Sequence, residues 1–400
     1  MPDRNVIYVP VDPKTYGCGL FLGFIYYYWR QIIVGIVILA LCTGACWLIY
    51  TTTNYIGRNM SFGIVGTCPP ANGCVFEIKD VEDMAWVHEP ALSKDGRLLA
   101  VNTSPAGVQI WDMQKQPPTQ LWVIPGEGDL VFSKDGTLLA IVSGGATILD
   151  VSSGQIMQKF AGGSFENSLF SVQFSPDGRI LAGLGISNTL SWWDVQSGQL
   201  ISQVTIDQCE KTFALQSSSD GTLVVGCGAD KLLLWDMTTQ VFQGEINLEP
   251  YLPRGNNTYQ SIVVEKLIFS PDNHYLAVSG RYEYTGGYSN PYIQIWDFQN
   301  QTYLSSIMAY IQYADGFQSV NDKMTFVTIE NPFDGTTITS NKVKLVYYDL
   351  QTGNILQEAA LPARMGTVKK IGGLASLPQF GEVILAGTKE GFSMWKLDSP

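Results

Sequence analysis

The sequence predicts an all-β domain of seven similar repeats, preceded by a single transmembrane helix. One stretch of nineteen apolar or uncharged residues stands near the N-terminus, and a strand–turn–strand phrase recurs seven times after residue 73. The chain has 400 residues, of which 46% are hydrophobic and only 15% are charged. Disordered chains have few apolar residues and many charges, so this composition excludes a largely disordered protein.

The transmembrane helix is predicted over residues 32–50, which read IIVGIVILALCTGACWLIY and carry no charge. A helix of this length is about 28 Å long, close to the ~30 Å thickness of the hydrocarbon core of a bilayer. Aromatic residues bracket it, with Tyr26–Trp29 before it and Trp47 and Tyr50 at its far end, as expected at the two membrane interfaces. A cleaved signal peptide has a shorter apolar run, so we expect an uncleaved span.

The basic residues that flank this span predict its orientation. Arg4, Lys14 and Arg30 precede it, whereas Arg58 follows it. Because basic residues concentrate on the cytoplasmic side, the N-terminus is expected in the cytoplasm and the C-terminal domain outside it. The predicted domains are a cytoplasmic or juxtamembrane segment (1–31), the transmembrane helix (32–50), a linker (51–73) and an extracytoplasmic repeat domain (74–400).

Each repeat begins with an apolar strand, passes through a Ser-x-Asp-Gly turn and ends in an aromatic–Asp pair. The third copy, for example, begins QFSPDGRILA and closes with LSWWD. The strands alternate with period two, and Asp-Gly turns let the chain adopt positive φ between antiparallel strands. The closing positions lie 38 to 61 residues apart, which fits one four-stranded propeller blade per repeat. They are Asp112, Asp150, Asp194, Asp236, Asp297, Asp349 and, in the degenerate last copy, Lys396.

These phrases resemble those of the WD-repeat β-propeller family over about residues 74–397. The resemblance implies a seven-bladed, WD40-like β-propeller. No repeat carries the Gly-His pair typical of the family, so the family's His–Ser–Asp network is not expected here. Only Asp230 stands in the family's turn before a Trp-Asp strand. The family closes its ring with a strand from the other end of the chain, and CVFEIK at 74–79 is expected to complete the last blade.

The composition argues against nucleic-acid binding and against most catalytic chemistry. Acidic residues outnumber basic ones by 36 to 24, whereas binding to a phosphate backbone requires clustered Lys and Arg. His88 and His274 are the two histidines of the chain, and His88 lacks the second histidine of an HExxH zinc site. The sequence contains no phosphate-binding loop, dinucleotide fingerprint or serine elbow. We therefore predict no catalytic residue, no metal and no cofactor.

The predicted function is a membrane-anchored, non-catalytic scaffold for protein partners. In a propeller of this family, the loops that the fifth repeat inserts at 281–292 and the sixth at 330–341 share one face with the connection at 248–260 between the fourth and fifth repeats. Tyrosine among Gly, Ser and Asn is typical of adaptable recognition loops, although such aromatic residues also pack long loops against themselves. The candidate partner-binding residues are Tyr251, Tyr259, Tyr282, Tyr284, Tyr288, Tyr292 and Phe333.

The predicted closing strand also suggests how the domain stands on the membrane. An outer strand runs from the opposite face toward the face that carries these insertions. The chain is therefore expected to enter at that opposite face, which would lie against the bilayer and leave the insertions pointing outward.

Two other functions remain open. One is a ligand-sensing or hydrolytic propeller, similar to lactonases or quinoproteins, that uses its central channel. The other is an envelope-assembly scaffold similar to the outer-membrane lipoprotein propellers, against which an uncleaved N-terminus argues.

Four cysteines follow the predicted span. Cys68 and Cys74 flank a Pro-Pro-Ala-Asn-Gly turn that could close a small disulfide loop, and Cys209 and Cys227 fall on neighbouring predicted strands. Two disulfides and four ordinary thiols both fit this spacing, because spacing alone does not determine connectivity.

Overall fold

The computed structural model describes residues 64–66, 74–79 and, with gaps, 90–396. The chain divides into two compact units, Met1–Ser61 and Phe62–Pro400, and all the described residues belong to the second. The predicted span at 32–50 thus lies outside them, and the described part contains no helix that is long and apolar enough to cross a bilayer. The gaps within 90–396 are 104–106, 116–117, 161–167, 210–211, 213, 229–230, 252–258, 285–288, 308–315, 321–322, 331–337, 340–343, 361–366, 378–380 and 389–390.

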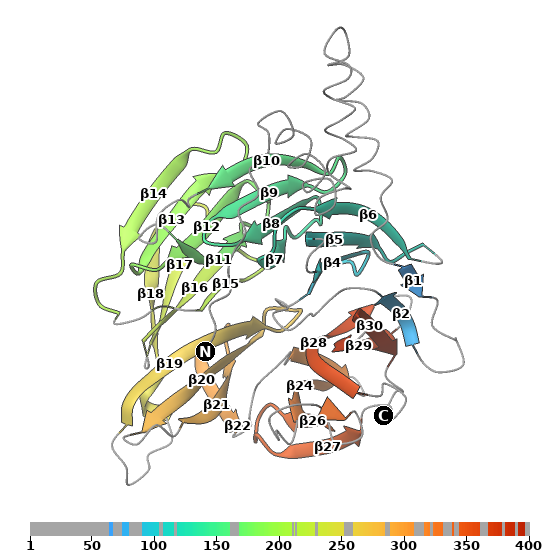
Figure 1. The fold of residues 1–400 in the computed structure, drawn as a ribbon. Coiled ribbons are helices and arrows are strands. Elements are labelled where there is room, and N and C mark those ends of the chain that lie inside the picture. Colours follow the sequence, from blue (N-terminus) through green and yellow to red (C-terminus); the bar gives the residue numbers. More distant parts are fainter. Residues whose placement is uncertain are drawn as a thin grey trace, which may run out of the picture. The chain divides into compact units, whose positions relative to one another are not determined.

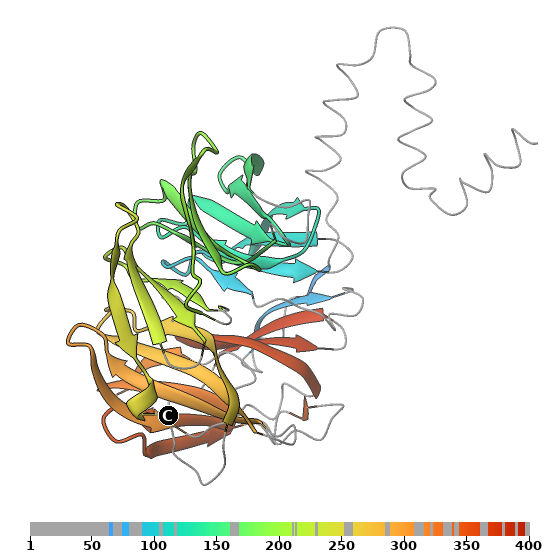
Figure 2. The ribbon, with the colours of Figure 1, turned by 90° about the vertical axis from the view of Figure 1, so that its left-hand side faces the viewer.

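The described residues form an all-β structure of seven antiparallel sheets (Figures 1 and 2). Six sheets have four strands, and in each the strands follow one another in chain order. We number the sheets by their order along the chain. The first sheet contains β3 (Ala91–Leu92), β4 (Leu98–Thr103), β5 (Gly107–Asp112) and β6 (Thr119–Ile124); the second, β7 (Asp129–Phe132), β8 (Leu138–Val142), β9 (Ala146–Asp150) and β10 (Gln155–Phe160); the third, β11 (Leu169–Phe174), β12 (Ile180–Gly185), β13 (Thr189–Asp194) and β14 (Leu200–Thr205).

The next three sheets repeat this plan, and each corresponds to one repeat of the sequence. A short 3₁₀ helix, η4 (Glu249–Tyr251), follows the last strand of the fourth sheet. The fourth sheet contains β15 (Leu215–Ser217), β16 (Thr222–Cys227), β17 (Lys231–Asp236) and β18 (Phe242–Asn247); the fifth, β19 (Tyr259–Phe269), β20 (Tyr275–Tyr284), β21 (Ser289–Asp297) and β22 (Thr302–Ile307); the sixth, β23 (Gly316–Val320), β24 (Lys323–Glu330), β26 (Lys344–Asp349) and β27 (Ile355–Ala360).

The seventh sheet joins strands from both ends of this unit. Its order is β1-β2-β30-β29-β28-β25. Cys74 of β2 lies opposite Trp395 of β30, so the prediction that residues 74–79 complete the last repeat is confirmed. The six strands are β1 (Ile64–Gly66), β2 (Cys74–Lys79), β25 (Ile338–Thr339), β28 (Thr367–Leu377), β29 (Gly381–Thr388) and β30 (Gly391–Lys396).

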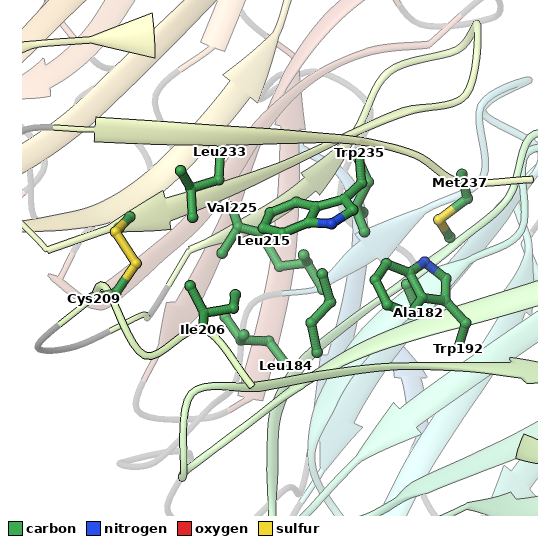
Figure 3. Close-up of a cluster of buried hydrophobic side chains, with 13 residues drawn as sticks. Ala182, Leu184, Trp192, Ile206, Cys209, Leu215, Val225, Leu233, Trp235 and Met237 are labelled. Atoms are coloured by element: carbon green, nitrogen blue, oxygen red, sulfur yellow. A yellow bond between two sulfur atoms is a disulfide. The ribbon is translucent and has the colours of Figure 1, made fainter. Parts of the chain in front are cut away.

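Consecutive sheets pack face to face in a propeller-like arrangement. From the first sheet to the sixth, the first strand of each contacts the first strand of the next. The apolar clusters between the first six sheets each draw side chains from two neighbouring sheets. Figure 3 shows the cluster between the third and fourth sheets, where Trp192 and Trp235 are almost fully buried. Burying one large apolar side chain contributes about 1.5–3 kcal/mol, so these interfaces supply most of the stability.

The Ser-x-Asp-Gly turn between the first and second strands is held by its own side chains. In the third sheet, Ser175 Oγ donates a hydrogen bond of 2.6 Å to Asp177 Oδ1 and accepts one of 2.9 Å from the Ile180 amide. Gly178 adopts φ +72°, a conformation that favours glycine. The same serine–aspartate hydrogen bond is present at Ser93–Asp95, Ser133–Asp135, Ser218–Asp220 and Ser270–Asp272.

In five repeats, the closing aspartate builds a second turn at the same end of the sheet. Asp194 Oδ1 accepts hydrogen bonds of 2.7 Å from both the amide and the hydroxyl of Ser197. We call this end of each sheet, which carries both kinds of turn, the turn end. The opposite end, where the second strand connects to the third, is the loop end. The equivalent aspartates Asp150, Asp236, Asp297 and Asp349 accept the same kind of hydrogen bond.

Three tryptophans of the repeats obtain a hydrogen-bond acceptor without the family's histidine. The indole Nε1 of Trp111 donates to Gln109 Oε1 at 3.2 Å, and that of Trp296 donates to Gln294 Oε1 at 3.1 Å. Trp395 likewise donates to Ser393 Oγ at 2.9 Å. In all three repeats the acceptor stands two residues earlier on the same strand, and the buried indole N–H is thereby satisfied.

Replacing the buried serine of one turn tests this account of the repeats. Ser175→Ala removes the acceptor of the Ile180 amide and the donor to Asp177, so we expect a loss of about 1–3 kcal/mol in the free energy of unfolding. The measurement is urea unfolding followed by circular dichroism. Gln199→Ala, which truncates an exposed side chain nearby, is the control and should change stability by less than about 0.5 kcal/mol. Equal effects of the two substitutions would contradict the account.

The turn aspartates predict the response of the fold to acid. The hydroxyl of Ser175 lowers the pKa of Asp177, and the Ser197 amide lowers the pKa of Asp194. A depressed pKa in the folded state stabilises the protein above the unfolded value of about 3.9, and this stabilisation is lost as pH falls through the folded value. Unfolding measured from pH 7 to pH 2 should therefore show stability falling below about pH 4, less steeply in Asp177→Asn. Constant or rising stability over that range would contradict this prediction. The pKa is also lowered for Asp95, Asp135, Asp150, Asp220, Asp236, Asp272 and Asp297.

Candidate functional site

The described residues contain no group of three or more His, Cys, Asp or Glu side chains placed to hold a metal ion. His274 lies in the first turn of the fifth sheet, where its Nε2 is 3.4 Å from Asp297 Oδ2 and its Nδ1 is 3.1 Å from Gln299 Oε1. This histidine thus joins the two turns of one sheet. His88 lies outside the described residues.

The insertion of the fifth repeat is mostly strand, and the expectation of a loop over 281–292 is wrong. β19, β20 and β21 have 11, 10 and 9 residues, whereas most strands of the other repeats have six. Tyr282 lies opposite Asn290, and Tyr259 opposite Tyr284. Tyrosine favours extended strands, so the insertion lengthens the sheet at its loop end. Tyr288 lies outside the described residues.

Tyr292 lies in the interior of the fifth sheet and is inaccessible to a partner. Its side chain is fully buried, and this burial raises the pKa of its hydroxyl. Gly280 lies directly opposite on β20, where a Cβ atom would collide with the Tyr292 ring and with a backbone oxygen of β19. Tyr292 therefore fills space that Gly280 leaves open, which corrects its assignment as a partner-binding residue.

Tyr251 packs against the outer part of the fifth sheet. Its ring stacks on Tyr303 with centroids 4.3 Å apart and planes at 14°, and it meets the edge of Trp296 at 5.3 Å and 88°. The side chain is still 42% exposed. Tyr251 thus packs locally, which was the alternative to partner binding. Part of its side chain remains in contact with solvent.

The insertion of the sixth repeat contributes a strand to the next sheet. Ile338 and Thr339 form β25, which lies opposite Val368 and Thr367 at the edge of the seventh sheet. Phe333 precedes this strand and lies outside the described residues.

An exposed apolar surface that sequence analysis did not identify lies on the outermost strands. In four sheets, the fourth-strand residue that lies opposite the residue before the closing aspartate is aliphatic or aromatic and 48–54% exposed. The position is the second residue after the Asp-x-x-x-Gly turn or its equivalent, so the sequence contains a signal for it. We call these four residues the outer-strand patch. They are Ile156, Leu200, Phe242 and Ile355.

The chain enters the described unit at the loop end, because an additional strand reverses its direction. Ile64 of β1 lies opposite Lys79 of β2, and Lys79 lies opposite Gly391, the first residue of β30. The third strand of each sheet begins at the loop end, so Ile64 lies at that end too. The expectation that the chain enters at the turn end is therefore wrong. That expectation assumed that residues 51–73 form a linker without strands, but β1 lies within this segment.

The structure joins Cys209 and Cys227 in a disulfide, with their Cα atoms 5.1 Å apart. Cys227 ends β16, whereas Cys209 lies in the connection after β14 and not on a strand as expected. The Asn188 side chain holds this connection, since its Nδ2 donates to the Cys209 carbonyl at 2.7 Å and its Oδ1 accepts from the Thr212 amide at 3.2 Å. Cys74 is the first residue of β2, and Cys68 lies outside the described residues.

No protein-family model matches the chain, and no curated protein matches it either. The likeness to WD-repeat propellers therefore rests on the repeated phrases and on the sheets that they form.

Removing the disulfide should destabilise the domain. Closing a loop of 18 residues stabilises a fold by about 3 kcal/mol in the chain-entropy model, so Cys209→Ala/Cys227→Ala should lower the free energy of unfolding by about that amount. Reductant should destabilise the unmodified protein and leave the double variant unchanged. Peptide mapping after alkylation should label these two cysteines only once the protein has been reduced. Labelling of both without reductant would show that the bond does not form.

Proposed function

We propose that this chain is a membrane-anchored, seven-bladed WD-repeat-like β-propeller that acts as a non-catalytic scaffold for protein partners. The outer-strand patch is the observation that carries the proposal. Four large apolar side chains, each about half exposed, stand at the same position of four sheets. Each of them adjoins a second exposed apolar residue (Met157, Ile201, Val241 or Leu356), and contiguous exposed apolar surface marks sites of protein–protein contact.

The seven blades and the membrane anchor belong to the same proposal. Seven repeats correspond to the seven sheets of the described part, and β2 completes the last sheet as the closing strand of a propeller does. The anchor is the apolar segment 32–50. The Cys209–Cys227 disulfide supports an extracytoplasmic location for the domain, because disulfides persist in oxidising compartments.

The entry of the chain at the loop end suggests which surfaces meet partners. The outer-strand patch begins next to the turn end, at the opposite end of the sheets from Ile64, where the chain enters. Tyr259, Tyr282 and Tyr284 on the lengthened fifth sheet stay predicted partner-binding residues at the loop end.

Affinity purification from gently solubilised membranes tests the scaffold. We expect the unmodified protein to recover a stoichiometric partner, and a variant with serine at all four patch positions to lose it. The control replaces the exposed polar neighbours Gln155, Gln199 and Asn354 by serine and should keep the partner. Equal thermal midpoints for the three proteins would exclude unfolding as the cause.

Two results would contradict the proposal. One is the absence of any stoichiometric partner from the unmodified protein, even after chemical cross-linking in intact membranes. The other is metal- or cofactor-dependent turnover of a small molecule by the purified protein, which would favour the ligand-sensing or hydrolytic alternative.

A further inference from the structure

The fourth and fifth sheets present the same pair of aromatic side chains at their outer edge. Trp235 of β17 pairs with Phe242 of β18, and Trp296 of β21 pairs with Tyr303 of β22. The ring centroids are 5.2 Å apart at 64° in the fourth sheet and 5.8 Å apart at 78° in the fifth. Both pairs are edge-to-face, a favoured arrangement of aromatic rings. The two sheets therefore offer equivalent aromatic surfaces.

The surface of the fifth sheet is covered by a segment of the chain itself. η4 places the Tyr251 ring flat on Tyr303 and edge-on to Trp296. The segment is a compact turn, in which the Tyr251 amide donates to the Leu248 carbonyl at 3.1 Å and the Glu249 amide donates to Asn247 Oδ1 at 2.9 Å. A single short turn with one aromatic side chain is thus sufficient to occupy this kind of surface.

The surface of the fourth sheet is open. Phe242 is 48% exposed, and Val241 beside it is exposed as well. In the connection that precedes this sheet, Cys209 is held by the disulfide to Cys227. Phe242 therefore presents to solvent a ring whose counterpart, Tyr303, is covered by Tyr251.

We propose that Phe242 and Val241 bind an aromatic side chain of a protein partner in the way that Tyr303 binds Tyr251. The inference rests on the proposed scaffold function and specifies the partner chemistry at one site. The partner presents a tyrosine, phenylalanine or tryptophan on a short turn, and its ring stacks on Phe242. Leu200 and Ile355 of the outer-strand patch have aliphatic side chains and offer no ring for such stacking.

The chain's own turn provides the probe for this site. The probe is a capped synthetic peptide of sequence NLEPYLP, which corresponds to residues 247–253, with 3-fluorotyrosine in place of tyrosine. It is titrated with the full-length protein in lipid nanodiscs and followed by broadening of its fluorine NMR signal. We expect Phe242→Ser to weaken binding at least tenfold and Phe242→Tyr to preserve it.

Four controls isolate the aromatic contact. Ile355→Ser alters an equally exposed patch residue and should bind the probe like the unmodified protein. An unlabelled peptide with leucine in place of tyrosine should not compete. Empty nanodiscs report partition of the probe into lipid, and thermal midpoints check that each variant is folded.

Equal broadening by the unmodified protein and by Phe242→Ser would overturn the inference. The partner purification described above separates this failure from failure of the scaffold. If a partner is recovered but binding of the probe does not depend on Phe242, the scaffold function is supported and the aromatic site is contradicted. If binding of the probe depends on Phe242 but no partner is recovered, the aromatic site is supported and the scaffold function is contradicted.

Discussion

The second to fifth sheets of this protein are apolar on both faces, and only neighbouring sheets can remove those faces from water. Along β8, Leu139 and Ile141 belong to the cluster shared with the first sheet, whereas Ala140 and Val142 belong to the cluster shared with the third. Because successive side chains of a strand point to opposite faces, one strand serves two cores. A single repeat would leave both of its apolar faces exposed, so the stability of each sheet depends on its neighbours.

This dependence explains why both ends of the unit meet in the seventh sheet. A series of such sheets leaves unpaired edges and uncovered faces at its two ends, and these are exposed to aggregation. β2 from the N-terminal side pairs with β30 from the C-terminal side, and β25 from the sixth repeat pairs with β28. The last sheet is thereby built from three parts of the chain, and it can form only after all of them are present.

The polar side chains of the repeats are largely engaged in maintaining the turns. Ser175 and Asp177 satisfy the backbone of one turn, and Asp194 and Ser197 satisfy the next. Because these carboxylates already accept several hydrogen bonds, they are poor candidates for acid–base chemistry. The part of a repeat that other molecules can contact is its outer strand, where the patch residue after the second turn is exposed in four sheets. Binding of a partner to this fold therefore depends on surface shape and on exposed apolar area.

The sequence alone determined the repeats, their strands, the Ser-x-Asp-Gly turns and the closing strand at 74–79, because period-two alternation and Ser-x-Asp-Gly turns are local features of the chain. The tertiary structure decided the features that depend on residues far apart in sequence. Tyr292 is buried because Gly280 lies across from it, and Tyr251 is packed because the fifth sheet presents Tyr303 to it. The entry of the chain at the loop end likewise depends on the pairing of β1 with β2. Local patterns specify which face a side chain occupies, but only the assembled neighbours decide whether that face is covered.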